Sequence, residues 1–225
     1  MIPVLAIDGP SGSGKGAVGF GVARALGWHY LDSGAVYRAL GLAASWAATA
    51  HDDVSGLTAL ATSLDLAFVG DDPEADVQVF VNGRECGAQL RSQEAADLAS
   101  QVAVLGPVRA ALLARQRAAR CPPGLVADGR DMGTQVFPDA VLKVFLTASA
   151  EVRAKRRFDQ LKGKGFGVTL PQLTREIRER DQRDAQRAVA PLRPAADAEM
   201  LDSSALGLQE VIDQVLAMVR KRLVV

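Results

Sequence analysis

The chain has 225 residues, of which 48% are hydrophobic and 23% charged, and its formal net charge is zero. This length suits one domain with a real core, and the neutral charge argues against a general binder of nucleic acid or of membrane surfaces. No apolar run approaches the roughly 20 residues of a membrane span, and the N-terminus lacks the pattern of a secretory signal.

Cysteine and histidine are common zinc ligands, and cysteine forms disulfides. The two cysteines and two histidines of this chain are isolated from one another. Cys86 and Cys121 lack metal-ligand spacing, so we expect reduced thiols in a cytoplasmic protein. His29 and His51 also stand alone. Their isolation argues against a zinc site and against a Ser-His-Asp triad.

An apolar run followed by a glycine-rich loop opens the chain. Residues 4–8 are predicted to form a buried strand and residues 15–26 a helix. The loop between them matches G-x-x-x-x-G-K-[ST] except at the last position, where Gly16 stands. Glycines let backbone N–H groups approach an anion, and Lys15 supplies a charge suited to phosphate oxygens. An ordinary glycine-rich turn is the alternative, but the strand-to-helix context favours a nucleoside triphosphate site.

A second strand is predicted over residues 28–31 and a helix over residues 35–50, with Asp32 or Ser33 as its N-cap. Arg38 lies one turn into this helix. It would suit a second anion site at the carboxyl end of the strand, or else a solvated surface position.

A small antiparallel insert is predicted next. Residues 57–64 suit a short helix, residues 66–69 and 77–81 alternate as strands do, and Asn82-Gly83 is a hairpin signal. Two helices follow, over residues 91–102 and 107–119. Ser100 and Arg109 lie near their facing ends, where they would either contact a ligand or serve as an ordinary helix-end hydroxyl and a surface arginine.

Residues 124–128 form an apolar strand that ends in Asp128, beside the charged turn of residues 129–133. An aspartate at the carboxyl end of a parallel strand is well placed to hold a water ligand of Mg²⁺. Arg130 would then lie between this metal and the second anion site. A tight surface turn is the alternative.

Two arginine-bearing helices are predicted after the strand of residues 141–146. The first starts at Ser149 or Glu151 and the second near Leu170, with a flexible glycine-rich bridge over residues 163–167. Between residues 151 and 187 there are eleven Lys/Arg and six Asp/Glu. This pattern suggests a lid that closes over phosphates, or else a solvated, salt-bridged hairpin.

One face of the second of these helices gathers three charged residues. Arg180, Asp184 and Arg187 are spaced i, i+4 and i+7, so they share that face. A strand over residues 199–201 and an amphipathic helix over residues 207–223 close the chain. Together the strands predict an α/β fold with a five-stranded parallel sheet, whose carboxyl edge collects the glycine loop, Ser33, Asp128 and Ser203.

These parts suit phosphoryl transfer, which depends on positioning and charge neutralisation. The sequence shows no obvious activating histidine. This fits an acceptor that is already an anion, such as the phosphate of a nucleotide, because an alcohol acceptor more often needs a base. A lid would exclude water and so limit hydrolysis of ATP.

At this point the chain resembles the bacterial cytidylate (CMP/dCMP) kinases, a family of nucleoside monophosphate kinases. The matching stretches are IDGPSGSGKG at residues 7–16, LDSGAVYR at 31–38, ADGRDMGTQVFPDA at 127–140, ERDQRDAQRAVAPL at 179–192 and LDSS at 201–204. The resemblance implies a single three-layer P-loop kinase domain over residues 1–225. It also implies a nucleoside monophosphate (NMP)-binding subdomain at residues 34–105 that includes a β insert at 65–90, a helical lid region at 150–187, and a core formed by the remainder.

The implied activity is transfer of the γ-phosphoryl group of ATP to CMP and dCMP, giving CDP or dCDP and ADP, in pyrimidine nucleotide metabolism. Mg²⁺ would accompany ATP, and the protein would be a cytoplasmic monomer without nucleic-acid or membrane partners. Two alternatives stay open: a P-loop kinase for another small acceptor such as UMP, AMP or shikimate, and a nucleotide-binding switch without efficient transfer.

The resemblance also implies a role for each matching residue. Those that would hold ATP are Gly9, Pro10, Ser11, Gly12, Ser13, Gly14, Lys15, Gly16 and Ala17. Those that would bind CMP are Ser33, Arg38, Ser100, Arg109, Arg130, Asp131, Arg180, Asp184 and Arg187. Those that would act in the transfer are Lys15, Asp128, Arg130, Arg153 and Arg157, with Asp128 also holding Mg²⁺ through water.

One residue departs from the family pattern. The family usually has threonine after Gly-Lys-Gly, and this chain has Ala17. A hydroxyl near the phosphates or the metal is therefore missing, which predicts weaker ATP binding or slower turnover rather than inactivity.

Overall fold

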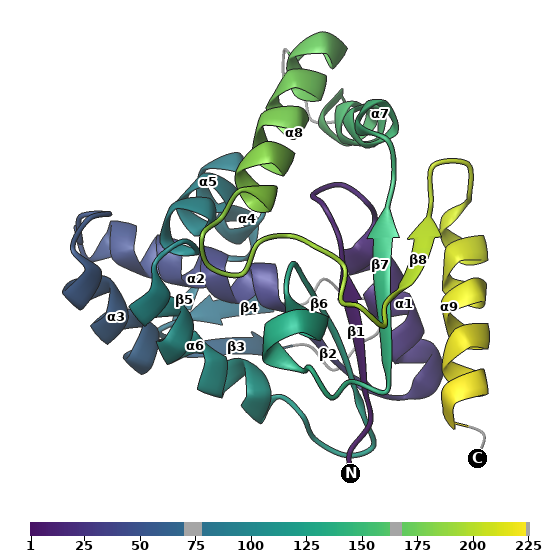
Figure 1. The fold of residues 1–225 in the computed structure, drawn as a ribbon. Helices are drawn as coiled ribbons and strands as arrows, with labels where there is room; N and C mark the ends of the chain where they lie inside the picture. The colour runs from purple at the N-terminus through teal and green to yellow at the C-terminus, as the bar shows by residue number, and fades with distance from the viewer. Residues whose placement is uncertain (70–77, 163–167, 224–225) are drawn as a thin grey trace. The chain divides into compact units, whose positions relative to one another are not determined.

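The computed structural model describes residues 1–69, 78–162 and 168–223 (Figure 1). The chain divides into two compact units. The first combines Met1–Leu31 with Arg117–Val225, and the second is Asp32–Gln116. The predicted glycine-rich bridge at residues 163–167 lies outside the described residues.

A five-stranded sheet forms the centre of the first unit. Its strands are, in spatial order, β2 (His29–Asp32), β6 (Leu125–Gly129), β1 (Val4–Asp8), β7 (Leu142–Thr147) and β8 (Glu199–Asp202). β1 runs parallel to β6 and β7, and β8 runs parallel to β7. Parallel strands end at the same edge of a sheet, so the segments after β1, β6 and β7 emerge together. The predicted α/β class and parallel sheet are confirmed.

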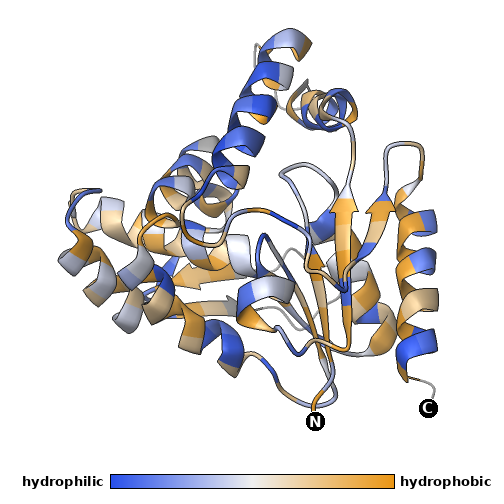
Figure 2. Ribbon diagram, viewed as in Figure 1, coloured by the Kyte–Doolittle hydropathy of each residue, from blue (hydrophilic) through white to orange (hydrophobic). Residues whose placement is uncertain are grey.

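Apolar residues of two helices complete the core of this unit. α1 (Lys15–Leu26) and α9 (Leu208–Leu223) contribute Val18, Val22, Val211 and Val215 to the cluster that covers the central strands. These valines recur every four residues, so each helix presents one apolar face to the sheet. Figure 2 shows the strands as largely hydrophobic and α9 as hydrophobic on one side.

Two polar helices and one short turn complete the first unit. α7 (Ala150–Lys162) follows β7, and α8 (Leu170–Ala185) begins after an N-cap at Thr169. α8 is mostly hydrophilic (Figure 2). Between β6 and β7 the chain forms a π-helical turn, η1 (Met132–Val136), which overlaps the end of the charged turn predicted over residues 129–133.

The second unit contains helices and a small antiparallel sheet. The helices are α2 (Ser33–Trp46), α3 (Val54–Ser63), α4 (Gly87–Leu90), α5 (Gln93–Val102) and α6 (Gly106–Ala118), the last of which runs two residues into the first unit. The sheet has the order β3 (Leu66–Val69), β4 (Gln78–Val81) and β5 (Arg84–Glu85). Asn82 and Gly83 both have positive φ, as the predicted hairpin between β4 and β5 requires. The expected antiparallel insert is confirmed.

The main departure in element length is at the end of α2. The prediction extended this helix to residue 50, but it ends at Trp46. Ala48 adopts φ 52°, and the N–H of Thr49 donates to the carbonyl of Ala44 at 2.9 Å. This is the closing bond of a Schellman turn, formed here with alanine where glycine is usual, so composition gave no signal for it.

Cys86 is buried and Cys121 exposed, and both are free thiols. Within the described ranges, no single helix is long and apolar enough to cross a membrane. Two consecutive helices, Glu94–Val102 and Gly106–Ala118, reach that length and composition only when they are counted together. The chain bends by 106° between them.

Candidate functional site

The glycine loop connects β1 to α1 and has the backbone shape of an anion cradle. Gly12 and Gly14 have φ of 78° and 94°, which favour glycine over residues with a side chain. In the part of the chain that the structure describes, no side chain caps the N-terminus of α1. Its first N–H groups therefore suit a negatively charged ligand. The Oγ of Ser13 is buried and has no hydrogen-bond partner among the described residues, as expected of a donor that serves a ligand.

Lys15 folds back over this loop. Its ammonium group donates to the carbonyl of Pro10 at 3.2 Å, and the residue is largely buried. A lysine held against the loop in this way is a positive charge at the position where phosphates would lie.

Two arginines from α7 hold carbonyl groups of the glycine loop. Arg153 donates to the carbonyl of Ser11 at 3.0 Å, and Arg156 donates to that of Ser13 at 3.2 Å. Arg156 also binds Ser203, whose hydroxyl donates to Ser13 at 3.1 Å. Arg157, which the sequence favoured, is half-buried on the same helix. Arg156 was missed, although its i, i+3 spacing from Arg153 places both on one face.

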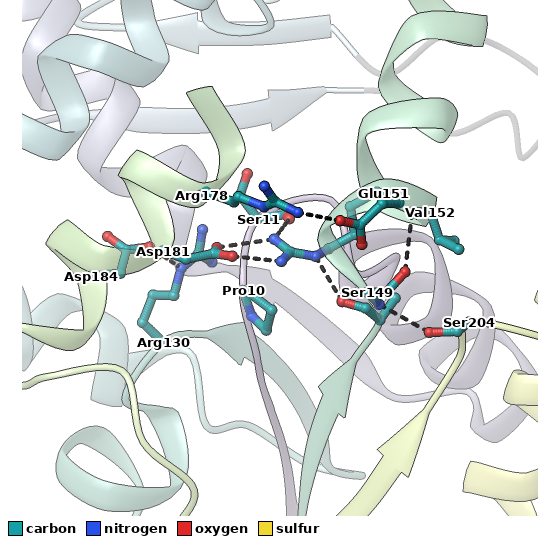
Figure 3. A network of polar contacts seen from close by, with 12 residues as sticks. Pro10, Ser11, Arg130, Ser149, Glu151, Val152, Arg178, Asp181, Asp184 and Ser204 are labelled. Carbon is teal, nitrogen blue, oxygen red and sulfur yellow. Dashed lines mark hydrogen bonds and ion pairs between the residues drawn. The ribbon is translucent and has the colours of Figure 1, made fainter. Parts of the chain in front are cut away.

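Arg153 joins the loop to α8 through an ion pair, which Figure 3 shows among its neighbours. Its guanidinium binds both carboxylate oxygens of Asp181, with one contact of 2.9 Å, and Arg153 also donates to the carbonyl of Ala148. Arg178 and Glu151 form a second, exposed pair between the same helices. Arg153 is therefore fixed between the loop, α7 and α8 rather than extended into solvent.

A buried carboxylate on α8 gathers two further arginines. Asp184 accepts from the Nε of Arg130 at 2.8 Å and also pairs with Arg187. Burial alone would raise the pKa of Asp184, but the charges of Arg130 and Arg187, with that of Arg180 nearby, hold this pKa below its usual value. The prediction that one helix carries Arg180, Asp184 and Arg187 on a shared face is wrong for Arg187, because α8 ends at Ala185 and Arg187 reaches Asp184 from the segment that follows. Arg130 is the partner that joins Asp184 from the turn after β6.

Asp8 fixes the turn after β6 from the end of β1. Its two carboxylate oxygens accept the backbone N–H groups of Met132 and Gly133, both at 2.8 Å. Burial raises the pKa of Asp8 to about 6, although these two N–H donors lower it. The bonds hold η1, and the adjoining Arg130 and Asp131, against the strand that carries the glycine loop. Sequence reasoning missed this role of Asp8, because its partners lie more than a hundred residues away.

Asp128, the candidate for binding metal through water, is buried at the end of β6. Its Oδ2 accepts a hydrogen bond from the hydroxyl of Tyr30 and lies 3.6 Å from where a Cβ on Gly16 would stand. No group of three His, Cys, Asp or Glu side chains that could hold a metal occurs in the described part of the chain. The buried carboxylate of Asp128 beside the loop is an oxygen donor of the type that could hold Mg²⁺ through water, as predicted from the sequence.

The second unit holds four of the residues expected to bind nucleotide. Asp32 caps α2 by accepting from the N–H of Ala35, and its other oxygen pairs with Arg38 at 2.7 Å. Ser33 is buried at the start of the same helix. The guanidinium of Arg109 lies 5.7 Å from the ring centre of Tyr37. Ser100 lies on α5, partly buried.

Comparisons with known proteins give consistent results. A family model described as cytidylate kinase matches residues 5–221. The curated cytidylate kinase of Methylococcus capsulatus is 55% identical over 219 residues, which cover 97% of each chain. That of Salmonella arizonae is 52% identical over 223 residues, 99% of this chain and 97% of the relative. A solved structure of an uncharacterised protein from Eubacterium ventriosum covers 98% of this chain and 99% of its own, with a TM-score of 0.53 and 11% identity, and supports the fold alone.

Proposed function

The chain belongs to the cytidylate kinase family, and we propose that it transfers the γ-phosphoryl group of ATP to CMP, giving CDP and ADP. The observation that carries this proposal is full-length identity above 50% to curated cytidylate kinases, joined to a glycine loop whose backbone and lysine suit a triphosphate. We extend the proposal to dCMP as a second acceptor and to a monomeric, cytoplasmic enzyme of pyrimidine nucleotide metabolism that has no nucleic-acid or membrane partner.

For ATP, we assign the phosphates to the loop of residues 9–17. Its N–H groups, Lys15 and the Oγ of Ser13 would bind the phosphate oxygens. Mg²⁺, when bound with ATP, would neutralise charge on the β- and γ-phosphates. Asp128 would hold that ion through water, because its carboxylate adjoins Gly16 at the start of α1.

For CMP, we assign the acceptor phosphate to arginines. In the first unit, Arg130 and Arg187 flank Asp184, and a guanidinium carries five N–H donors in a planar fork that suits phosphate oxygens. Asp131 would line the nucleotide site, and Arg180 and Asp184 would contact the sugar. In the second unit, the family resemblance extends to Ser33, Arg38, Ser100 and Arg109 as nucleotide contacts, and we retain residues 34–105 as the NMP-binding subdomain.

Transfer would then proceed by direct attack of a CMP phosphate oxygen on the γ-phosphorus, with ADP as the leaving group. The acceptor oxygen is already an anion, so the protein needs no general base. Lys15, Arg130, Arg153 and Arg157 would stabilise charge on the transferred group. We assign residues 150–187 to the lid. Arg153 supports this assignment because it links α8 to the loop that would hold ATP.

A coupled assay of ADP formation tests the function. Mg-ATP is supplied with CMP, dCMP, UMP, AMP or shikimate in separate reactions, and the product is identified by chromatography. We expect ADP and CDP in equal amounts with CMP, and the corresponding dCDP with dCMP. Stimulation by another acceptor alone would indicate a different kinase, and ATP binding without transfer to any acceptor would indicate a nucleotide-binding protein. Either result would refute the proposal.

A further inference from the structure

A tyrosine hydroxyl from β2 lies beside the start of α1, close to Asp128. We infer that Tyr30 is a positioning residue for the metal-bound triphosphate: it supplies a hydroxyl beside Gly16, where the loop has none, and fixes the carboxylate of Asp128 toward the metal. This inference rests on the proposed use of Mg-ATP. It assigns a task to a residue that neither the loop motif nor the arginine clusters include.

The loop of this chain lacks side-chain oxygen where the motif G-x-x-x-x-G-K-[ST] has it. Gly16 occupies the [ST] position, and the next residue, Ala17, is also without a hydroxyl. A Cβ built on Gly16 would lie 3.6 Å from the Oη of Tyr30 and 3.6 Å from the Oδ2 of Asp128. The tyrosine hydroxyl therefore adjoins the space that a serine or threonine side chain at residue 16 would enter.

The hydroxyl is bonded to the carboxylate that the mechanism uses. Tyr30 donates to the Oδ2 of Asp128, and its oxygen lies 3.3 Å from the carbonyl oxygen of Gly16. A hydrogen bond from a fixed donor restricts the rotation of a carboxylate about its terminal torsion, which otherwise has a broad preference. Asp128 would thus be aligned before Mg-ATP binds, and the cost of ordering it at that moment is avoided.

The ring of Tyr30 is held in place by α1. Gly19 lies on the same face of the helix as Gly16, and its added Cβ would stand only 3.0 Å from the Cε2 of Tyr30. Phe20 meets the ring edge to face, with centroids 5.9 Å apart. The glycines make room for the ring and Phe20 supports it, so the hydroxyl has a fixed position relative to Asp128.

The substitution Tyr30→Phe tests the inference because it removes the hydroxyl and keeps the ring packing. The readout is the binding of ADP, measured by calorimetry with Mg²⁺ and with EDTA, together with the steady-state dependence of CDP formation on Mg-ATP. We expect the gain in ADP affinity that Mg²⁺ confers to fall by about 2- to 10-fold, the worth of one hydrogen bond. The KM for CMP should be unchanged.

Two further variants separate positioning from packing. Phe20→Leu weakens the support of the ring but keeps the hydroxyl, so it should lower the melting temperature and leave the Mg²⁺ effect near that of the unmodified protein. Gly16→Ser in the Tyr30→Phe background returns a hydroxyl to the same space and should restore much of the Mg²⁺ effect.

The inference is overturned if Tyr30→Phe retains the full Mg²⁺ effect, if Phe20→Leu loses as much of it, or if Gly16→Ser restores none. Failure of the proposed function would look different: the unmodified protein would make no CDP, whereas calorimetry with ADP and Mg²⁺ would still report on Tyr30.

Discussion

Replacing Asp184 by asparagine removes one negative charge from between two arginines. In the structure this carboxylate is 1% exposed and binds the side chains of Arg130 and Arg187, which are 17% and 9% exposed. Asparagine has nearly the same shape, but its amide offers one oxygen acceptor and turns an N–H₂ group toward the other guanidinium. In the variant, two largely buried guanidinium groups therefore share one amide oxygen in place of two carboxylate oxygens.

The expected loss of stability follows from this burial. Removing one partner of a buried ion pair costs about 3–5 kcal/mol, because the remaining charge stays desolvated. The asparagine oxygen still accepts from one arginine, so we expect the lower end, about 3 kcal/mol. That is a large part of the 5–15 kcal/mol that holds most domains together. An isosteric change in an exposed ion pair should reduce the free energy of unfolding much less. Glu151→Gln is therefore the matched control, because Glu151 pairs with Arg178 at the surface.

Urea unfolding followed by tryptophan fluorescence measures the loss. The chain has two tryptophans: Trp28 packs against the core of the first unit, and Trp46 belongs to the second. A Trp46→Phe background makes the signal report on the unit that contains Asp184. In this background we expect Asp184→Asn to lower the unfolding midpoint by roughly 1 M urea, from typical urea dependences, and Glu151→Gln to leave it unchanged.

The pH dependence gives a second check. Since the folded-state pKa of Asp184 lies below its usual value, the carboxylate contributes its full stability at neutral pH and loses it only below about pH 4, as it becomes protonated. The difference between the unmodified protein and Asp184→Asn should thus stay constant from pH 8 to pH 5. A loss below about 1 kcal/mol, far under the buried-pair range, or a difference that shrinks within this pH interval, would refute the reasoning.

Two further predictions concern the glycine loop and the strand before it. Ala17 is exposed, and Ala17→Thr returns the hydroxyl that is usual in the family. The KM for ATP should fall, or turnover should rise, by the equivalent of about 1–3 kcal/mol. Unchanged ATP kinetics would contradict this prediction. Asp8 has a folded-state pKa of about 6 against 3.8 normally, so its contribution to stability is greatest at low pH and declines as pH rises through 6. Relative to Asp8→Asn, the unmodified protein should lose about 1 kcal/mol of unfolding free energy between pH 5 and pH 7.5, and a gain over that range in thermal melts would count against the shift.

Local patterns predicted most of the elements but not how they pair. The apolar run before the glycine loop and the i, i+4 spacing of Arg180 and Asp184 on α8 follow from backbone geometry, so β1 and this pair could be predicted. The end of α8 at Ala185, two residues before Arg187, could not. The partnership of Asp184 with Arg130, 54 residues away, depends on tertiary packing, which no local spacing encodes.

The same limit explains the choice between neighbouring arginines on α7. Arg153, Arg156 and Arg157 all fit a phosphate-binding face by type and spacing. Which of them reaches the glycine loop depends on the angle at which the helix leaves β7, and in the structure Arg153 and Arg156 do so. Likewise, Tyr30 meets Asp128 because β2 lies beside β6, an order set by the fold as a whole.

The position of β1 in the sheet has a consequence for synthesis of the chain. β1 leaves the ribosome well before its two neighbours, β6 and β7, which begin at Leu125 and Leu142. At typical elongation rates of roughly 5–20 residues per second, this buried strand waits for about 10 s before its two neighbours are made. During that interval the whole of Asp32–Gln116 is made. The second unit therefore has all its residues for folding before α7, whose Arg153 and Arg156 hold the glycine loop, has been made.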